Sequence, residues 1–312
     1  MVQNNIQKSY LHMNSIYKKF YRDFYFRTNG FIPSSPLNKT LFPGDFFHII
    51  NGEMVVLGNI FSGNIVDTKN VDFEHNIKLN PDAWKFNQGV SKPYAGRGTG
   101  ESMDGEFEFS KQILAFESSG SFLFSGNHPE AVRIKNWTDI QNELIIKLTQ
   151  INYSFRKLYL VTETASTSDW TLAVSGAKNG ELEIAIENEN FGLVDIFGLE
   201  NSRTIQSKDI EFYHRQNERK PSFFKAKKLK EQDEKLSVFI NELIYQRSVI
   251  KQWGQKFYTY PFAQSEDYDL AQIHNNQISI LDLLPGNQLN PNTALLYFKW
   301  ADTSLDDVEL FF

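Results

Sequence analysis

The stretch from Gly105 to Phe197 constrains the fold of this chain more than any other part. It contains runs in which apolar and polar residues alternate, such as GEFEF from Gly105 to Phe109 and ELEIAIE from Glu181 to Glu187. Successive side chains of a strand point to opposite faces, so these runs predict strands with one apolar and one polar face. Such a sheet can cover a core and meet water, or place its apolar face in lipid. Alternation alone does not choose between these states.

Two short turns divide this stretch. Ser118 to Gly120 and Gly176 to Gly180 each separate two strand-like runs, so we expect the flanking runs to pair as a hairpin at each turn. Between them, residues 137 to 153 are predicted to form an amphipathic helix, with Asn136 as its N-cap. Leu158 to Val161 then predicts a buried strand.

The first hundred residues contain a helix, a hairpin and a glycine-rich run. Apolar and aromatic residues recur every three or four positions from residue 4 to residue 26, which predicts a helix. Asn51-Gly52, between two apolar runs, predicts a type I′ hairpin over residues 44 to 58. Residues 91 to 100 hold three glycines and two cations, which suggests phosphate binding, but their spacing fits no phosphate-binding fingerprint, so we predict a hairpin loop or a linker there.

These patterns predict an α+β fold, with a twisted, mainly antiparallel sheet, amphipathic hairpins, flanking helices and a helical C-terminal region. We expect residues 1–230 to form the α+β domain and residues 231–312 the helical region, with a regulatory role as one option. The helical prediction rests on a single apolar stripe from Glu231 to Trp253, followed by Gly254 as a natural stop.

Composition narrows the class of protein. A net charge of -6 argues against general nucleic-acid binding, and the absence of cysteine excludes disulfides and thiolate chemistry. We find no signal peptide and no apolar run long enough to span a membrane as a helix, so a cytoplasmic protein is expected. The six histidines show no metal-ligand spacing, and we find no catalytic or cofactor motif. A triad whose members meet only in the fold stays open.

Two basic groups and one acidic segment are the candidate functional residues. Such groups are most often solvated surface, and the first helix can simply pack on the domain. An anionic lipid surface is the functional alternative, because it contributes about 1 kcal/mol per nearby cation. The acidic and apolar C-terminus is a candidate autoinhibitory segment that would dock on the second basic group. The membrane-contact candidates are Lys18, Lys19, Arg22, Lys225, Lys227 and Lys228, and the autoinhibition candidates are Asp306, Asp307, Phe311 and Phe312.

The order of a hairpin, an amphipathic helix and LYLVTET from Leu158 to Thr164 resembles the gasdermin pore-forming domain over about residues 100 to 230. Arg203 to Asp209 and Ile210 to Tyr213 are similar to the late strand pair that closes that domain. The resemblance implies an autoinhibited protein that forms homo-oligomers in a membrane as amphipathic β-hairpins once an inhibitory C-terminal segment is lost. The chain lacks the N-terminal cysteine that is lipidated in bacterial gasdermins.

Two function classes follow from the sequence. The first is an autoinhibited pore-forming effector, used in bacterial antiviral defence or as a toxin, which associates with anionic membranes after activation by a protease or a protein partner. The second is a non-enzymatic binding or assembly protein with a soluble α+β domain. Dye release from anionic liposomes, before and after limited proteolysis, separates the two classes.

Overall fold

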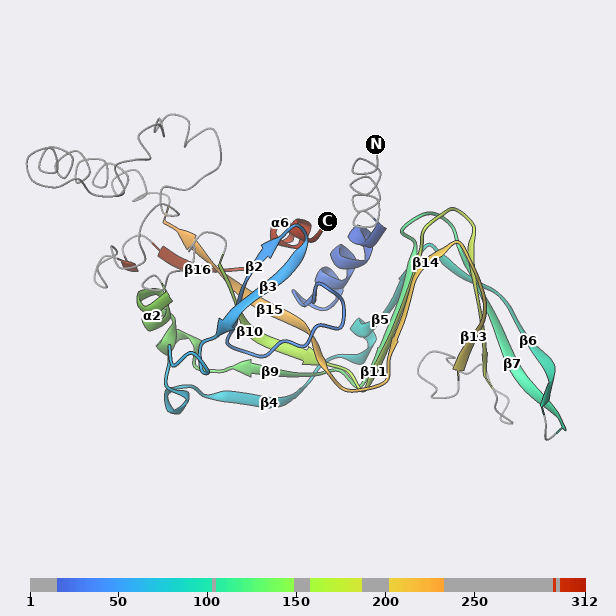
Figure 1. Ribbon diagram of the computed structural model, residues 1–312, viewed down its shortest axis with the longest axis horizontal. Helices are drawn as coiled ribbons and strands as arrows, with labels where there is room; N and C mark the ends of the chain where they lie inside the picture. Colours follow the sequence, from blue (N-terminus) through green and yellow to red (C-terminus); the bar gives the residue numbers. More distant parts are fainter. Residues whose placement is uncertain (1–15, 103–104, 149–157, 187–201, 233–293, 296–297) are drawn as a thin grey trace, which may run out of the picture.

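The computed structural model describes six segments of the chain, residues 16–102, 105–148, 158–186, 202–232, 294–295 and 298–312. The fold is α+β, with mainly antiparallel sheet and few helices. Within the described residues the strands form one eight-stranded sheet and two four-stranded sheets, named here sheets A, B and C. Figure 1 shows sheet A on the left and an arch of long strands, made by sheets B and C, on the right.

Sheet A is the body of the fold. Its strands are β1 (Ile32–Pro33), β2 (Asp45–Ile50), β3 (Glu53–Asn59), β4 (Phe73–Lys78), β9 (Glu130–Ile134), β10 (Tyr159–Ser166), β15 (Pro221–Glu231) and β16 (Phe298–Asp302). β15 pairs with β10 along one edge, and with β1 and then β16 along the other. The C-terminal strand β16 therefore belongs to the same sheet as the first strand.

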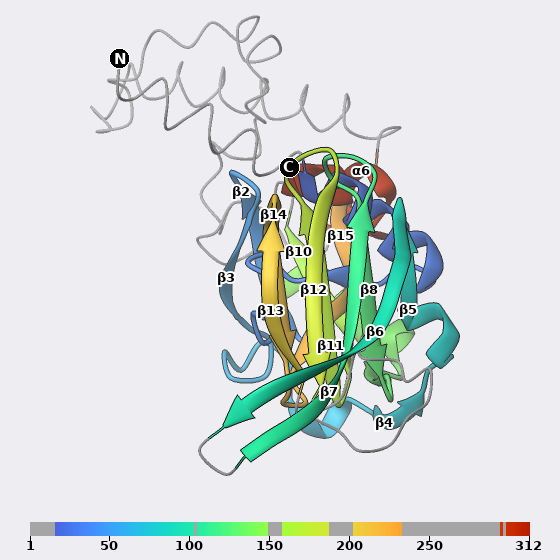
Figure 2. The same cartoon turned by 90° about the vertical axis from the view of Figure 1, so that its right-hand side faces the viewer.

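Sheets B and C contain four strands each. Those of sheet B are β5 (Lys85–Gln88), β8 (Phe122–Asn127), β11 (Asp169–Ser175) and β14 (Ile210–Gln216). Those of sheet C are β6 (Val90–Ser102), β7 (Gly105–Phe116), β12 (Gly180–Ile186) and β13 (Ser202–Lys208). The spatial order β14-β11-β8-β5 in sheet B is repeated as β13-β12-β7-β6 in sheet C. Figure 2 views the arch from its outer side and shows this matched order with the strands side by side.

Each strand of sheet B continues through a short bend into the strand at the same position in sheet C. The bends lie at Gly89, residues 117–121, residues 176–179 and Asp209. Each bend contains a residue with positive φ, which reverses the chain over very few residues. The arch in Figure 1 is therefore a four-stranded sheet that is folded back on itself.

Neighbouring bends are joined by backbone hydrogen bonds. The Gly120 amide donates to the Ser175 carbonyl at 2.7 Å, and the Ser175 amide donates to the Ser121 carbonyl at 2.9 Å. The Gly176 amide donates to the Asp209 carbonyl at 3.0 Å. These bonds hold three of the four bends in line, so the arch has a continuous crest.

The central strands of sheet B, β8 and β11, are buried on both faces. One face packs on a helix of residues 16–27 through aromatic rings, with Phe20 and Phe122 centroids 5.5 Å apart and Phe24 and Phe124 centroids 5.2 Å apart. Each fully buried ring stabilises the fold by roughly 2 kcal/mol, more than most surface ion pairs. The other face packs on sheet C through a smaller cluster of buried side chains, namely Leu114, Phe116, Leu123, Ala173, Leu182 and Ile184.

The predicted hairpins at the two short turns are wrong. β7 and β8 lie in different sheets, and so do β11 and β12. β8 pairs with β11, and β7 pairs with β6 and β12. The late strands β13 and β14 are likewise separated by a bend rather than paired with each other. A period of two records which face a residue takes, but not which strand lies beside it.

Two other predictions met different outcomes. The type I′ turn is confirmed, with φ of 52° at Asn51 and 82° at Gly52. The predicted loop over residues 91–100 is wrong, because it lies in β6, where pairing with β7 outweighs the weak strand propensity of glycine.

The helical predictions are confirmed only where the structure describes them. Residues 16–27 are helical, and α2 spans Trp137–Leu148, while residues 4–15 and 149–153 lie outside the described residues. The predicted C-terminal helix does not begin at Glu231, since β15 extends to that residue, and its remainder from residue 233 also lies outside them. No helix within the described residues is both long enough and apolar enough to cross a membrane.

Candidate functional site

The C-terminal segment, residues 298–312, begins with a strand of sheet A and continues along the helix of residues 16–27. Its strand β16 pairs with the end of β15, with Trp300 opposite Leu229. The chain then forms the short helix α6 (Leu305–Val308) and a 3-10 turn, η5 (Glu309–Phe311). Figure 1 shows α6 beside the helix of residues 16–27, on the same side of the molecule as the bends of the arch. Ser304 and Asp307 form a capping box, which explains why a helix starts there.

Asp307 is the centre of the contact between this segment and sheet A. It is only 5% exposed. One carboxylate oxygen, Oδ1, accepts hydrogen bonds from Lys228 Nζ and from the Tyr159 hydroxyl, both at 2.7 Å. The other, Oδ2, accepts from the Ser304 amide at 2.9 Å. Every partner is a donor, so the site is built for a carboxylate anion.

These contacts shift the pKa values of the groups concerned. Burial alone would raise the pKa of Asp307, but the hydrogen bonds from Lys228, Ser304 and Tyr159 and the Lys228 charge lower it below its ordinary value. Burial and the hydrogen bond to the Asp307 anion raise the pKa of Tyr159. At neutral pH the pair is therefore an ionised carboxylate and a neutral phenol.

The same segment contacts the helix of residues 16–27. The Tyr25 hydroxyl donates to the Thr303 carbonyl at 2.9 Å, just after β16. The Tyr21 ring stacks on Phe311 with centroids 5.8 Å apart and meets Phe312 edge-on at 5.6 Å. Outside these rings, Glu309 lies 3.8 Å from Lys18 Nζ and 3.9 Å from the Arg22 guanidinium. Aromatic contacts surrounded by ion pairs therefore join the C-terminal segment to the helix of residues 16–27.

The structure brings four of the six predicted basic residues under the C-terminal segment. Lys227 pairs with Asp302 and Lys228 with Asp307, while Lys18 and Arg22 lie beside Glu309. The two others lie elsewhere. Lys19 donates to the Ser118 hydroxyl and the Ser119 carbonyl in a bend, and Lys225 pairs with Glu163.

The acidic candidates separate in the same way. Asp307 is buried in its network, and Phe311 is 5% exposed, whereas Asp306 faces solvent. Sequence reasoning missed Tyr159 and Tyr25 as partners of this segment. A tyrosine in a run predicted to be buried was the available signal, because a buried hydroxyl needs a hydrogen-bond partner.

We expect this attachment to weaken in acid. Because the folded pKa of Asp307 lies below its ordinary value of 3.8, the ionised network contributes stability above that value and loses it as the pH falls through the folded pKa. The stability difference between the wild type and Asp307→Asn, measured by urea unfolding from about pH 6 to pH 2, should therefore shrink as the pH falls. A difference that stays constant over this range would contradict the assignment.

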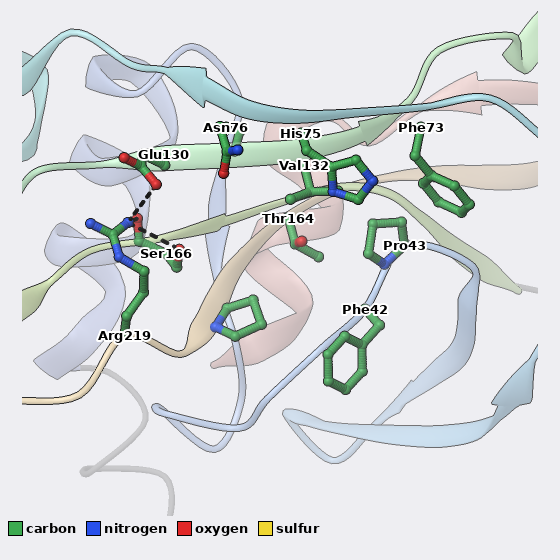
Figure 3. Close-up of a pocket in the computed structure, with 12 residues that line it drawn as sticks. Phe42, Pro43, Phe73, His75, Asn76, Glu130, Val132, Thr164, Ser166 and Arg219 are labelled. Atoms are coloured by element: carbon green, nitrogen blue, oxygen red, sulfur yellow. Dashed lines mark hydrogen bonds and ion pairs between the residues drawn. The ribbon is translucent and has the colours of Figure 1, made fainter.

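A hollow of about 490 Å³ is lined by β4, β9 and β10 of sheet A and by Phe42 and Pro43 before β2, and one end of it lies at the connections to sheet B (Figure 3). Here the chain passes from β8 to β9, from β10 to β11 and from β14 to β15. Arg219, in the third connection, donates to the His128 carbonyl at 3.0 Å and to the Ser166 carbonyl at 3.3 Å, and pairs with Glu130 at 3.3 Å. Its guanidinium ties the three connections together, so we assign this hollow a structural role at the base of the arch.

The chain's own geometry carries the functional argument. No protein-family model matches the chain, and a search of curated proteins finds no match either. Among the residues that the structure describes, no cluster of three or more His, Cys, Asp or Glu side chains is arranged to hold a metal ion. The candidate functional site is therefore the set of contacts between the C-terminal segment and β10, β15 and the helix of residues 16–27.

Proposed function

We propose that the protein is an autoinhibited pore-forming effector whose sheets B and C straighten and enter a membrane as amphipathic β-hairpins after the C-terminal segment is released. One observation carries this proposal. Every strand of sheet B continues into the strand that has the same neighbours in sheet C. Straightening the four bends would therefore join the two sheets into one continuous four-stranded sheet without exchanging a strand partner.

The straightened strands would be long enough for a bilayer. A transmembrane strand needs about 9–11 residues, and β6 and β7 alone have 13 and 12. The chain would make two long hairpins, one from β5 to β8 and one from β11 to β14. Because side chains alternate along a strand, Leu114, Leu182 and Ile184 of sheet C would then share one apolar face with Phe122 and Leu172 of sheet B.

The same sheet explains how copies would assemble. Within the described residues, β5 and β6 form one outer edge of the arch, and β14 and β13 form the other. Because four antiparallel strands alternate in direction, the two edges run in opposite directions. The edge of one copy can then pair with the opposite edge of the next, head to tail, which leads to a homo-oligomer.

The contacts of the C-terminal segment fit autoinhibition and lipid binding. Lys18 and Arg22 lie next to Glu309 and Lys228 lies next to Asp307, so loss of the chain after β16 would uncover these three cations. Each would gain about 1 kcal/mol at an anionic lipid surface. A protease or a protein partner that removes the segment would activate the protein. This scheme agrees with the gasdermin resemblance and with a cytoplasmic effector in antiviral defence, or a toxin.

Dye release from liposomes tests this function. A specific protease site between Asp302 and Leu305 would allow the segment to be cut from the folded protein. The cut protein should release dye from anionic liposomes and much less from neutral ones, because the uncovered cations drive binding, whereas the uncut protein should release none. If the cut protein stays folded and loses its segment, but never releases dye, the proposal is wrong.

An assembly protein is the second candidate, and one observation favours it. Ile50, Val55 and Val56 on the β2–β3 hairpin are 49%, 40% and 36% exposed. β3 ends the main strand order of sheet A, and exposed apolar strands at a sheet edge are typical of surfaces that bind other chains. In the liposome experiment, this function predicts a cut protein that remains monomeric and causes no leakage.

A further inference from the structure

We propose that the helix of residues 16–27 is the relay through which the C-terminal segment holds the arch bent. The segment would fix the position of the helix, and the helix would stabilise the bent form of the crest of the arch. The inference deepens the proposed function and rests on it for its biological meaning, but the coupling itself is a property of the protein in solution. The helix makes contacts on two of its sides, one with the C-terminal segment and one with the crest of the arch.

One side of the helix faces the C-terminal segment. Lys18, Tyr21, Arg22 and Tyr25 recur at spacings of three and four residues, so they share one side. Lys18 and Arg22 lie beside Glu309, Tyr21 contacts Phe311 and Phe312, and Tyr25 bonds the Thr303 carbonyl. The segment therefore contacts this side over two turns of the helix.

The other side faces the crest of the arch. Lys19 Nζ donates to the Ser119 carbonyl at 3.2 Å and lies 3.4 Å from the Ser118 hydroxyl, within the bend between β7 and β8. The same bend approaches the helix backbone so closely that a Cβ on Gly120 would lie 3.1 Å from the Ile16 carbonyl oxygen. Gly120 also has φ of 73°, so glycine is required there for two reasons.

A second contact reaches β14, at the far edge of sheet B. The Tyr17 ring meets Phe212 edge-on, with centroids 5.5 Å apart. The helix thus touches the β7–β8 bend and β14, while the hydrogen bond from Gly120 to Ser175 connects that bend to β11. The helix therefore contacts two of the four strands that would straighten, and this hydrogen bond links a third strand to it.

The contacts between the helix and the bends differ between the bent and the straightened state of the strands. Contacts between the helix and the bends exist only while the strands are bent, so they stabilise the bent state. The C-terminal segment stabilises the position of the helix. Loss of the segment should therefore loosen the bends, even though its described contacts are with the helix, β10, β15 and α2.

Hydrogen exchange in the absence of a membrane tests the relay. Deleting residues 309–312 removes Glu309, Phe311 and Phe312, but keeps β16 and Asp307. The bend amides of Gly120, Ser175 and Gly176 should then exchange on the order of tenfold faster, since local opening becomes easier. The control is Asp306→Ala, which should leave their exchange unchanged. Faster exchange in residues 16–27 with unchanged bends would overturn the relay and leave the helix as ordinary core.

A second variant tests the other link. Lys19→Ala removes the contact with Ser118 and Ser119 from an exposed position, so folding should be preserved. It should speed exchange at the bend amides but not in β16. Faster exchange in β16, or none at the bends, would contradict the direction of the coupling. If the bend amides exchange faster but no dye is released, only the pore function is contradicted. If the cut protein releases dye but its bend amides do not exchange faster, only the coupling through the helix is contradicted.

Discussion

Replacing Asp307 by alanine should release the C-terminal segment, while replacing its neighbour Asp306 by alanine should leave the segment in place. The two residues are adjacent and carry the same charge. Asp307 is buried and accepts from Lys228, Tyr159 and Ser304, whereas Asp306 is exposed. A purely electrostatic attraction between an acidic tail and a basic surface would predict similar effects for both substitutions.

The size of the effect follows from burial. Removing one partner of a buried ion pair costs roughly 3–5 kcal/mol, because the other charge is left without compensation. Lys228 retains 28% of its side-chain exposure, so water offsets part of this loss, and we expect about 2–3 kcal/mol. The Glu309 pairs, at 3.8 and 3.9 Å on the surface, contribute about 1 kcal/mol or less. Asp307 therefore dominates the charged contacts.

Urea unfolding and hydrogen exchange in β16 would measure this effect. Asp307→Ala should lower the free energy of unfolding and speed β16 exchange, whereas Asp306→Ala should change the free energy by less than about 0.5 kcal/mol. Tyr159→Phe removes one hydrogen bond to Asp307 and should give an intermediate effect of about 1 kcal/mol. Equal effects at positions 306 and 307 would contradict the buried network.

Much of the local structure could be predicted from the sequence. Alternation located the strands around Phe122 and Leu182, the Asn51-Gly52 dipeptide located a hairpin, and helical periodicity located α2 and the helix of residues 16–27. These features depend on residues close together in the chain, where local propensity and periodicity carry the information.

The pairing of the strands could not be predicted in the same way. The turn after Phe116 looks like a hairpin turn, although it is a bend between stacked sheets. Whether two strands pair or stack depends on their neighbours, and here β8 gains β5 and β11 as neighbours from distant parts of the chain. The sequence also suggested the acidic tail and its basic partners, but not that Asp307 rather than Asp306 would be buried.

A disulfide across one bend should lock the arch. An ideal Cβ at Gly180 lies 3.3 Å from the Ser175 Cβ, close to the separation of about 3.5–4.5 Å in disulfides. These residues end β11 and begin β12, and the chain has no other cysteine to interfere. A straightened strand would separate their Cα atoms by about 16 Å, whereas a disulfide holds them within about 7 Å. The locked protein cannot straighten this strand.

The substitutions themselves should be tolerated. Ser175→Cys loses the hydrogen bond from the Ser175 hydroxyl to the Ala177 carbonyl, at a cost of about 1 kcal/mol. A new Cβ at Gly180 would overlap the Ser175 hydroxyl oxygen, whose place the bonded sulfur takes, and would lie 3.2 Å from the Asp209 carbonyl oxygen, so the bend must shift by a few tenths of an ångström to accept the bridge. The single variant Ser175→Cys shares the hydrogen-bond loss but cannot form the bridge, and is the matched control.

If the arch must straighten to permeabilise a membrane, a disulfide across one bend should block dye release. The most direct test measures dye release from anionic liposomes with the Ser175→Cys, Gly180→Cys protein, after its C-terminal segment has been cut. The oxidised protein should release no dye, and reduction should restore release to the level of the Ser175→Cys control. If the oxidised, cut protein released dye as fast as the reduced one, straightening of the β11–β12 bend would not be part of its activity.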